Sequence, residues 1–384
     1  MPLRVSKRSA TIVQSEIRVM TLECDAVGGV NLSQGICDLE LPAPVGQGAH
    51  EAIDRGENHY TRYDGHPALR EAIARKMWAY NRIRADPETE VVVSGGSTGA
   101  FYCACLALLD PGDEVLVFQP YYGYHVNTLL AAGAVPVYAT LAPPDWAIDF
   151  DELNRAVSPR TRAIVVNTPC NPCGKVFARE EIGRLAEFAV RHDLFVFTDE
   201  IYEYFLYDGR EHVSPGSLAA IADRTITVSG YSKTYSITGW RIGYAVCRER
   251  WARMIGYVSD LVYVCPPAPL QMGVARGIDE LPPGYYQSLR DEYTRKREVI
   301  CSALSRAGLA PHVPQGAYYV LADVSRLPGA TSKERVMHLL RAVGVAAVPG
   351  SAFYADGQGE SLARFCFAKS NDVLAEACER LAKL

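Results

Sequence analysis

Between residues 90 and 246, short apolar runs rich in β-branched residues alternate with longer amphipathic stretches. Apolar runs of this length predict strands, and apolar positions that recur with the helical period predict helices over 97–109, 123–132 and 179–192. Strand and helix in alternation predict an α/β fold, in which a mostly parallel, mixed sheet is sandwiched by helices. The predicted strands are the runs EVVVSGG, EVLVFQP, VPVYATL, TRAIVVNTP, LFVFTDE, TITVSGYS and WRIGYAV.

The pattern changes near residue 285 to a long charged helix (285–307), two or three strands and a final helix (371–384). A chain of 384 residues also exceeds what one hydrophobic core usually fills. We therefore expect a large domain over 41–284 and a smaller α+β domain over 285–384. An N-terminal arm, residues 1–40, is expected to pack with the small domain.

The composition is that of an ordinary globular protein, with 48% hydrophobic and 22% charged residues. A net charge of −5 provides no basic field for a nucleic-acid backbone, so no nucleic-acid partner is expected. No apolar stretch reaches the roughly 18 residues of a membrane-spanning helix, so no membrane partner is expected either. The basic N-terminal residues lack the apolar core of a signal peptide, and the 11 scattered cysteines favour reduced thiols. These features indicate a cytoplasmic protein.

Several predicted strands end in polar turns marked by glycine or proline. In an open α/β sheet, ligands bind at the carboxyl ends of the strands. The turn SGGST at 94–98 leads into a predicted helix and offers free backbone amides and hydroxyls to a phosphate. Glycine turns before helices are common, so this turn alone is equally well explained as a tight turn.

Lys233 follows a buried strand in the segment GYSKTYSITGWRIGY and is flanked by Tyr231, Ser232 and Tyr235. Burial lowers the pKa of an amine and makes it available for a Schiff base with an aldehyde. Arg241 lies further along the same segment, and its forked guanidinium suits phosphate oxygens. Taken singly, a surface lysine and a helix-capping arginine would be the better explanation of each residue.

Asp199 ends the apolar run LFVFT, where a carboxylate is costly unless a cation meets it. A protonated pyridine nitrogen would be such a cation, and its protonation makes the ring an electron sink. The alternative is an aspartate that caps the next helix or pairs with an arginine. Tyr202 and Asn171 could reach a hydroxyl of the ring. Tyr122 could stack on the ring face, although as one of 22 tyrosines it could equally be packing.

In order and spacing, these motifs resemble the class I/II aminotransferases, which are pyridoxal-phosphate (PLP) enzymes of fold type I, aspartate aminotransferase-like. VVNTPCNPCGKVF resembles the NPTG segment of that family, TDEIYEYF its aspartate-tyrosine motif, and SGYSKTYSITGWRIGY its Schiff-base lysine signature. IRVMTLECDAVGGVNLSQGICDLELPAP resembles the N-terminal arm and first substrate loop, and YTRYDGHPALREAIA the segment that contacts the partner's cofactor. VPGSAFY and ARFCFA resemble the loop and strand around the substrate-binding arginine. The resemblance runs from about residue 12 to the C-terminus.

The resemblance implies a role for each matching residue. Lys233 would form the Schiff base with PLP and then shuttle a proton between the substrate α-carbon and the cofactor. Asp199 would hold the pyridinium nitrogen, and Asn171 and Tyr202 the ring oxygen. Bidentate recognition of the substrate α-carboxylate falls to Arg364. The other implied contacts are Tyr122 over the ring face, Gly96, Ser97, Thr98 and Arg241 at the phosphate, Tyr60 at the phosphate of the other subunit of a homodimer, and Gly35 and Asn171 at the substrate.

A few positions depart from the family pattern. Gly230 stands where relatives usually have serine, which implies one phosphate hydroxyl fewer. Cys173 replaces the threonine of NPTG and is expected to leave the turn intact. Arg62 replaces a proline, and it either leans toward the active site across the dimer interface or is a plain solvated arginine. Cys170 and Cys173 have CxxC spacing, but no second pair follows at zinc-finger distance, so metal or redox work there is the minor alternative and no metal is expected.

The resemblance implies an aminotransferase that moves an amino group between an L-amino acid and a 2-oxo acid, by a ping-pong mechanism through pyridoxamine phosphate. The alternative on this fold is elimination, replacement, oxidation or cyclisation, because all begin with a carbanion at the α-carbon, and Gly230 favours it somewhat. A PLP-sensing regulator would need a DNA-binding domain, for which the resemblance leaves no room. Substrate preference stays open, although many tyrosines hint at an aromatic or amphipathic pocket: Tyr60, Tyr63, Tyr121, Tyr124, Tyr263, Tyr318 and Tyr354.

Overall fold

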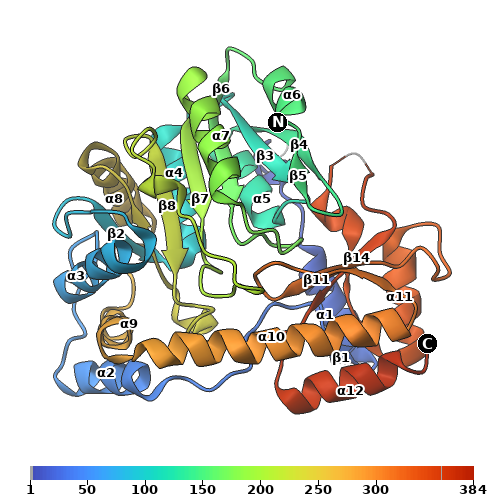
Figure 1. Cartoon of the computed structure of the whole chain (residues 1–384). Coiled ribbons are helices and arrows are strands. Elements are labelled where there is room, and N and C mark those ends of the chain that lie inside the picture. Colours follow the sequence, from blue (N-terminus) through green and yellow to red (C-terminus); the bar gives the residue numbers. More distant parts are fainter. Residues whose placement is uncertain (1–2, 356) are drawn as a thin grey trace.

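The computed structural model describes residues 3–355 and 357–384, and its centre is an eight-stranded sheet (Figure 1). The strand order is β2-β9-β8-β7-β6-β3-β4-β5. Neighbours from β8 to β4 run parallel, whereas β9 is antiparallel to both of its neighbours and β5 to β4. The predicted mixed, mostly parallel sheet is therefore confirmed. Its strands are β2 (Val91–Gly95), β3 (Glu114–Gln119), β4 (Val135–Ala142), β5 (Ala147–Ile148), β6 (Thr161–Asn167), β7 (Phe195–Asp199), β8 (Thr225–Gly230) and β9 (Ile242–Val246).

Successive residues of the central strands pack into different hydrophobic clusters on the two faces of the sheet. In β3, Val115 and Val117 join one cluster, while Leu116 and Phe118 join the other. Because both faces are buried, these strands read as continuous apolar runs in the sequence. One face is covered by α4 (Gly96–Leu108), α5 (Gly123–Ala132) and α8 (Glu249–Tyr263), and the other by α6 (Phe150–Arg155) and α7 (Arg179–Arg191).

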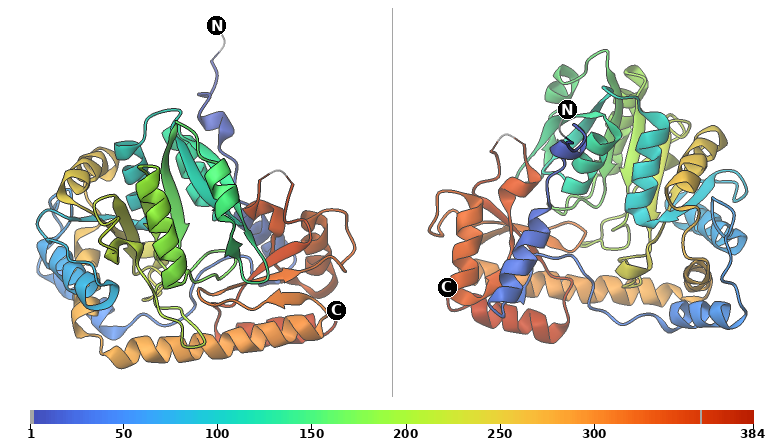
Figure 2. Two further views of the ribbon diagram at one scale, coloured as in Figure 1. Left: turned by 45° about the horizontal axis from the view of Figure 1, so that its top comes forward. Right: turned by 180° about the vertical axis from the view of Figure 1, so that it is seen from behind.

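The C-terminal part of the chain builds a smaller antiparallel sheet with the order β10-β11-β14-β13. The long helix α10 (Pro283–Arg306), predicted at 285–307, runs beneath both parts of the molecule in Figure 1. Strand β1 (Val30–Asn31) pairs in parallel with β12 (Val345–Ala346), and α1 (Glu16–Ala26) lies against the same C-terminal part (Figure 2). The other elements here are β10 (Ala310–His312), β11 (Tyr319–Asp323), β13 (Val348–Pro349), β14 (Leu362–Cys366) and α12 (Asn371–Leu381).

The C-terminal pattern was read incompletely from the sequence. A further helix, α11 (Ser332–Val343), lies between the strands and begins with a capping box of Thr331 and Glu334. Strands β12 and β13 have two residues each, which is too short for alternation to be visible. Among the described residues no helix is both long and apolar enough to cross a membrane. The remaining α-helices are α2 (Ala43–Asp54), α3 (Pro67–Lys76) and α9 (Ala268–Glu280).

Candidate active site

A cavity of about 480 Å³ opens at the carboxyl ends of the central strands, where the α/β fold rule places ligands. Most of the predicted site residues line it, although they come from segments far apart in the sequence. Gly96 lies in the turn directly before this lining, and Tyr60 lies outside it with 83% of its surface exposed. The predicted residues in the lining are Gly35, Ser97, Thr98, Tyr122, Asn171, Asp199, Tyr202, Lys233, Arg241 and Arg364.

Lys233 follows β8 and directs its amine into the cavity. Its Nζ donates a hydrogen bond of 3.0 Å to the carbonyl of Gly35, and it lies 6.0 Å from the centre of the Tyr318 ring. Burial lowers the pKa of Lys233 below its ordinary value, because the charged form loses solvation. More of this amine is therefore neutral near neutral pH than in a surface lysine, and a neutral amine is the nucleophile that an aldehyde requires.

Asp199 ends β7 and is nearly buried at the floor of the cavity. Its Oδ2 lies 2.8 Å from Nε2 of His125, and its Oδ1 accepts a 3.2 Å hydrogen bond from the backbone amide of Ile201. His125 belongs to α5 and was missed by the sequence reasoning, although it follows Tyr122 closely in the turn YYGYH. The histidine holds one side of the carboxylate and so orients it.

The turn into α4 forms a cradle for an anion. Gly96 has φ +78°, and a Cβ there would lie 2.3 Å from Nη2 of Arg241, so only glycine fits. Arg241 donates to the carbonyls of Thr238 at 2.9 Å and Gly95 at 3.4 Å. Within residues 3–355 and 357–384 it has no acidic partner. An unpaired guanidinium beside a helix N-terminus that carries Ser97 suits a phosphate.

Arg364 on β14 is fully buried, with 0% of its surface exposed. Its Nη1 donates to Oδ1 of Asn171 at 2.8 Å, and its Nη2 donates to the carbonyl of Ser33 at 2.6 Å. Its guanidinium carbon lies 4.2 Å from the centre of the Tyr319 ring, and its Nε has no hydrogen-bond partner. No carboxylate of the described chain neutralises it. A buried cation without a counter-charge is costly, so this arginine is suited to bind an anionic ligand.

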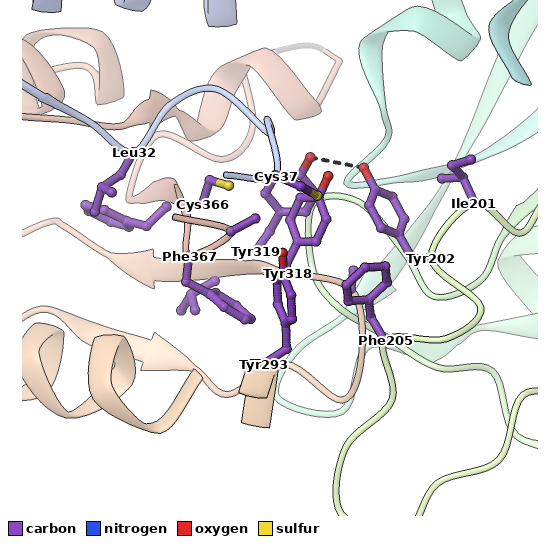
Figure 3. Packing of buried hydrophobic residues seen from close by; sticks show 14 of the residues in the cluster. Leu32, Cys37, Ile201, Tyr202, Phe205, Tyr293, Tyr318, Tyr319, Cys366 and Phe367 are labelled. Carbon is purple, nitrogen blue, oxygen red and sulfur yellow. Dashed lines mark hydrogen bonds between the residues drawn. The ribbon is translucent and has the colours of Figure 1, made fainter. Parts of the chain in front are cut away.

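Tyr319, which lies beside this arginine, meets tyrosines from other segments of the chain, and Figure 3 shows it close to Tyr202 and Tyr318. The hydroxyls of Tyr202 and Tyr319 lie 3.0 Å apart, and burial raises the pKa of Tyr202 well above its ordinary value. A Cβ on Gly35 would lie 1.9 Å from the Tyr319 hydroxyl, which explains the glycine at this position. The Tyr318 hydroxyl donates to the carbonyl of Gly35 at 3.2 Å. The loop around Gly35 is thereby fixed against β11.

Behind the cavity, Glu200 and Glu203, which directly follow Asp199 and Tyr202 in the sequence, belong to a buried polar network. Glu200 accepts hydrogen bonds from Ser214 at 2.7 Å and lies 2.7 Å from Nε2 of His212. Although burial opposes it, these contacts hold the pKa of Glu200 below its ordinary value. Glu203 pairs with the ammonium of Lys76. Glu200, Glu203 and His212 bring ligand atoms within 4.8 Å of one another, but Lys76 already supplies a cation there.

Two of the departures from the family pattern have a structural explanation. A Cβ on Gly230 would lie 3.0 Å from both the Cα of Gly243 and the carbonyl oxygen of Ile242, so a serine would be crowded between β8 and β9. Arg62 forms a paired contact with Asp64 and a 3.0 Å ion pair with Glu88 of its own chain. Arg62 therefore has anionic partners within its own chain, and its approach to the active site across the dimer interface stays a prediction.

The geometry thus combines a desolvated lysine, a buried carboxylate, an anion cradle and a buried unpaired arginine in one cavity. These are the features of a fold-type I PLP enzyme, in which the ring nitrogen, phosphate and aldehyde each meet a fitting group. The family model for aminotransferase class I and II matches residues 27–381, and the chain belongs to this family. It is a PLP-dependent aminotransferase.

Relatives named as aminotransferases match essentially the whole chain. The chain is 36% identical to the aspartate aminotransferase of Pyrococcus abyssi, over 100% of this chain and 98% of that one. It is 34% identical to aromatic-amino-acid aminotransferase 2 of Thermococcus litoralis, over 100% and 98%. Among solved structures, N-succinyldiaminopimelate aminotransferase from Mycobacterium tuberculosis superposes with a TM-score of 0.95 at 35% identity, covering 99% of each chain.

Proposed function

We propose that the enzyme transfers the amino group of an L-amino acid to a 2-oxo acid in two half-reactions at this single cavity. The observation that carries the proposal is the buried, unneutralised guanidinium of Arg364 in the same cavity as the desolvated amine of Lys233. Amino acids and 2-oxo acids share a carboxylate next to the reacting carbon. One arginine can therefore hold both substrates in turn, as a ping-pong reaction requires.

The residues of the cavity divide the work of holding PLP. Arg241, with the turn of Gly96, Ser97 and Thr98, would hold the phosphate, and Asp199 would meet the ring nitrogen. Asn171 and Tyr202 would hold the ring oxygen, and Tyr122 would cover one face. When bound, PLP supplies an aldehyde that condenses with amines and a protonated ring that withdraws electrons from the substrate α-carbon.

Lys233 would be the residue that moves protons. With PLP held in the cavity, the neutral amine of Lys233 would take a proton from the substrate α-carbon and return it. The lowered pKa of Lys233 supports this role, since a general base acts best when its pKa lies near the working pH. Arg364 and Asn171 would meanwhile hold the carboxylate, so that the α-carbon faces the lysine.

The side chain of the substrate would lie toward the N-terminal segment. Ile17, Arg18, Gln34 and Ile36 line the cavity there. Arg18 is the one cation of the lining for which the roles above provide no anion, and no hydrogen bond or ion pair joins its side chain to another described residue. We propose that it favours substrates with an acidic or amide side chain.

The assembly proposed is a cytoplasmic homodimer in which Tyr60 contacts the phosphate bound by the partner. The high exposure of Tyr60 in the single chain supports a contact with another subunit, and the 11 free cysteines support a reducing compartment. We also propose the division into an N-terminal arm (1–40), a large domain (41–284) and a small domain (285–384). Pairing of β1 with β12 supports the assignment of the arm to the small domain.

The absorption of bound PLP provides the test. With an amino acid added alone, the band of the lysine-bound cofactor should be lost and replaced by that of the aminated cofactor, and a 2-oxo acid should restore it. Recovery of the original band without an oxo acid would instead indicate elimination, replacement, oxidation or cyclisation. Lys233→Ala should abolish the lysine-bound band, and an unchanged spectrum in that variant would refute the assignment.

A further inference from the structure

Tyr319 is a tyrosine of the cavity for which the amino transfer proposed above provides no role. It lies at the start of β11 and lines the cavity, with 3% of its surface exposed. Its hydroxyl lies 3.0 Å from that of Tyr202, and the two rings meet edge to face at an interplanar angle of 85° (Figure 3). A second buried phenol therefore contacts the group that would meet the ring oxygen of PLP.

The Tyr319 side chain is fixed at both of its ends. Tyr319 pairs with Cys366 across β11 and β14, which places it diagonal to Arg364 on the same face of the sheet. The guanidinium carbon of Arg364 lies 4.2 Å from the centre of the Tyr319 ring. At the far end, a Cβ on Gly35 would lie 1.9 Å from the hydroxyl, so the loop closes tightly over it. With ring and hydroxyl both packed, Tyr319 holds its contact with Tyr202 in one geometry.

The protons of the two phenols decide which hydroxyl donates. Each phenol carries one proton and can also accept a hydrogen bond through its oxygen. Burial raises the pKa of both Tyr202 and Tyr319 above its ordinary value, so both protons are retained near neutral pH. When the Tyr202 proton points to the ring oxygen, the 3.0 Å contact is a hydrogen bond only with Tyr319 as the donor. A hydroxyl that accepts one hydrogen bond donates a stronger one, because the two bonds polarise each other.

We propose that Tyr319 is a positioning residue that donates a hydrogen bond to Tyr202 and thereby strengthens the hydrogen bond from Tyr202 to the ring oxygen of PLP. This inference rests on the proposed function, in which Tyr202 meets that oxygen. Tyr319 fixes the direction of the Tyr202 proton and makes Tyr202 the stronger donor. A donor to the ring oxygen stabilises the negative charge on it. That charge is greatest when the nitrogen joining Lys233 to the cofactor has no proton, so Tyr319 favours the unprotonated form.

The test is a spectroscopic pH titration of the PLP-loaded enzyme without any substrate. The absorption of the lysine-bound cofactor depends on its protonation, so the band gives the midpoint of the titration directly. Tyr319→Phe keeps the ring beside Arg364 and removes the hydroxyl alone. The midpoint should rise by about 0.3–0.5 pH unit, the value expected when a hydrogen bond to a charged group loses roughly a quarter of its strength.

A double-variant cycle tests whether Tyr319 acts through Tyr202. Tyr202→Phe removes the proposed donor to the ring oxygen and should raise the midpoint further, by about one to two pH units. In that background Tyr319→Phe should add no more than about 0.1 pH unit, because the group through which it acts is gone. An equal shift by Tyr319→Phe in both backgrounds would refute the proposal, since Tyr319 would then act on the cofactor by another route.

Tyr286→Phe is the matched control. Tyr235 and Tyr286 form another phenol pair, with hydroxyls 2.9 Å apart, and neither residue lines the cavity. Loss of the Tyr286 hydroxyl should leave the midpoint unchanged, and a shift as large as that of Tyr319→Phe would count against a specific role. A native band whose midpoint Tyr319→Phe does not move would overturn this inference alone. Absence of the band from the native enzyme would overturn the proposed function together with it.

Discussion

Replacing Arg364 with alanine removes the buried cation that is proposed to hold the substrate α-carboxylate. The guanidinium is 0% exposed and has no anion in the described chain, so a bound carboxylate would be its only counter-charge. Truncating one member of a buried, hydrogen-bonded charge pair costs about 3–5 kcal/mol. At about 1.36 kcal/mol for each factor of ten, the lower figure predicts a loss of roughly 150-fold in kcat/KM.

The assay follows the cofactor band during the first half-reaction with a single amino acid, in single-turnover mode. Arg364→Lys should recover part of the rate, because the charge remains while the forked geometry is lost. The informative control is a primary amine of the same side chain without the carboxylate. Its slow reaction should be the same in Arg364→Ala as in the native enzyme. If the amine loses as much rate as the amino acid, Arg364 acts on the fold or the cofactor, and the argument from the unpaired charge is wrong.

Three further changes test other parts of the site. The pKa of Lys233 is lower in the folded chain than its ordinary value of 10.5. At pH values between the two, the unfolded chain binds more protons than the folded chain, so the free energy of unfolding of the apoprotein should rise with pH over that range. In urea unfolding, any gain in the free energy of unfolding that Lys233→Met produces should shrink from pH 7 to pH 10. A gain that is the same at both pH values would contradict the lowered pKa of Lys233. Gly230→Ser should lower the free energy of unfolding by about 1–3 kcal/mol through crowding against Gly243, without improving the Kd for PLP; tighter PLP binding would show that the hydroxyl reaches the phosphate. Arg18→Ala should raise KM for aspartate and glutamate about fivefold, the modest value of an exposed ion pair, and leave alanine unchanged; equal effects on all three would refute an electrostatic preference.

The parts of the fold that could be predicted are those with uninterrupted patterns. Each strand of the central sheet from β2 to β9, apart from the two-residue β5, was visible as an apolar run, because both faces of the sheet are buried. The elements of the C-terminal part were harder to predict. Its strands β12 and β13 are too short to alternate, and the polar start of α11 hid a helix that is held by its capping box.

The residues of the site also divide into those that could be predicted from the sequence and those that could not. Lys233, Asp199 and Asn171 lie in motifs that are compact in sequence, so their meeting in one cavity could be predicted. His125, Tyr319 and Arg18 could not be found in that way, because each is an ordinary residue locally and reaches the cavity through tertiary packing alone. One acidic partner of Arg62 could not be predicted either. Asp64 is close to Arg62 in the sequence, but Glu88 approaches Arg62 only in the folded chain.

The pairing of β1 with β12 has a consequence for how the protein is made. Residues 30 and 31 leave the ribosome long before their strand partners at 345 and 346 are synthesised. The segment that carries Gly35 and the Ser33 carbonyl, which holds Arg364, must therefore wait for strand β12 before it can pair. Contacts so distant along the chain slow folding and leave incomplete chains exposed to misassembly. A truncated chain could build most of the central sheet but not this half of the active site, so activity is acquired only when the last strands are in place.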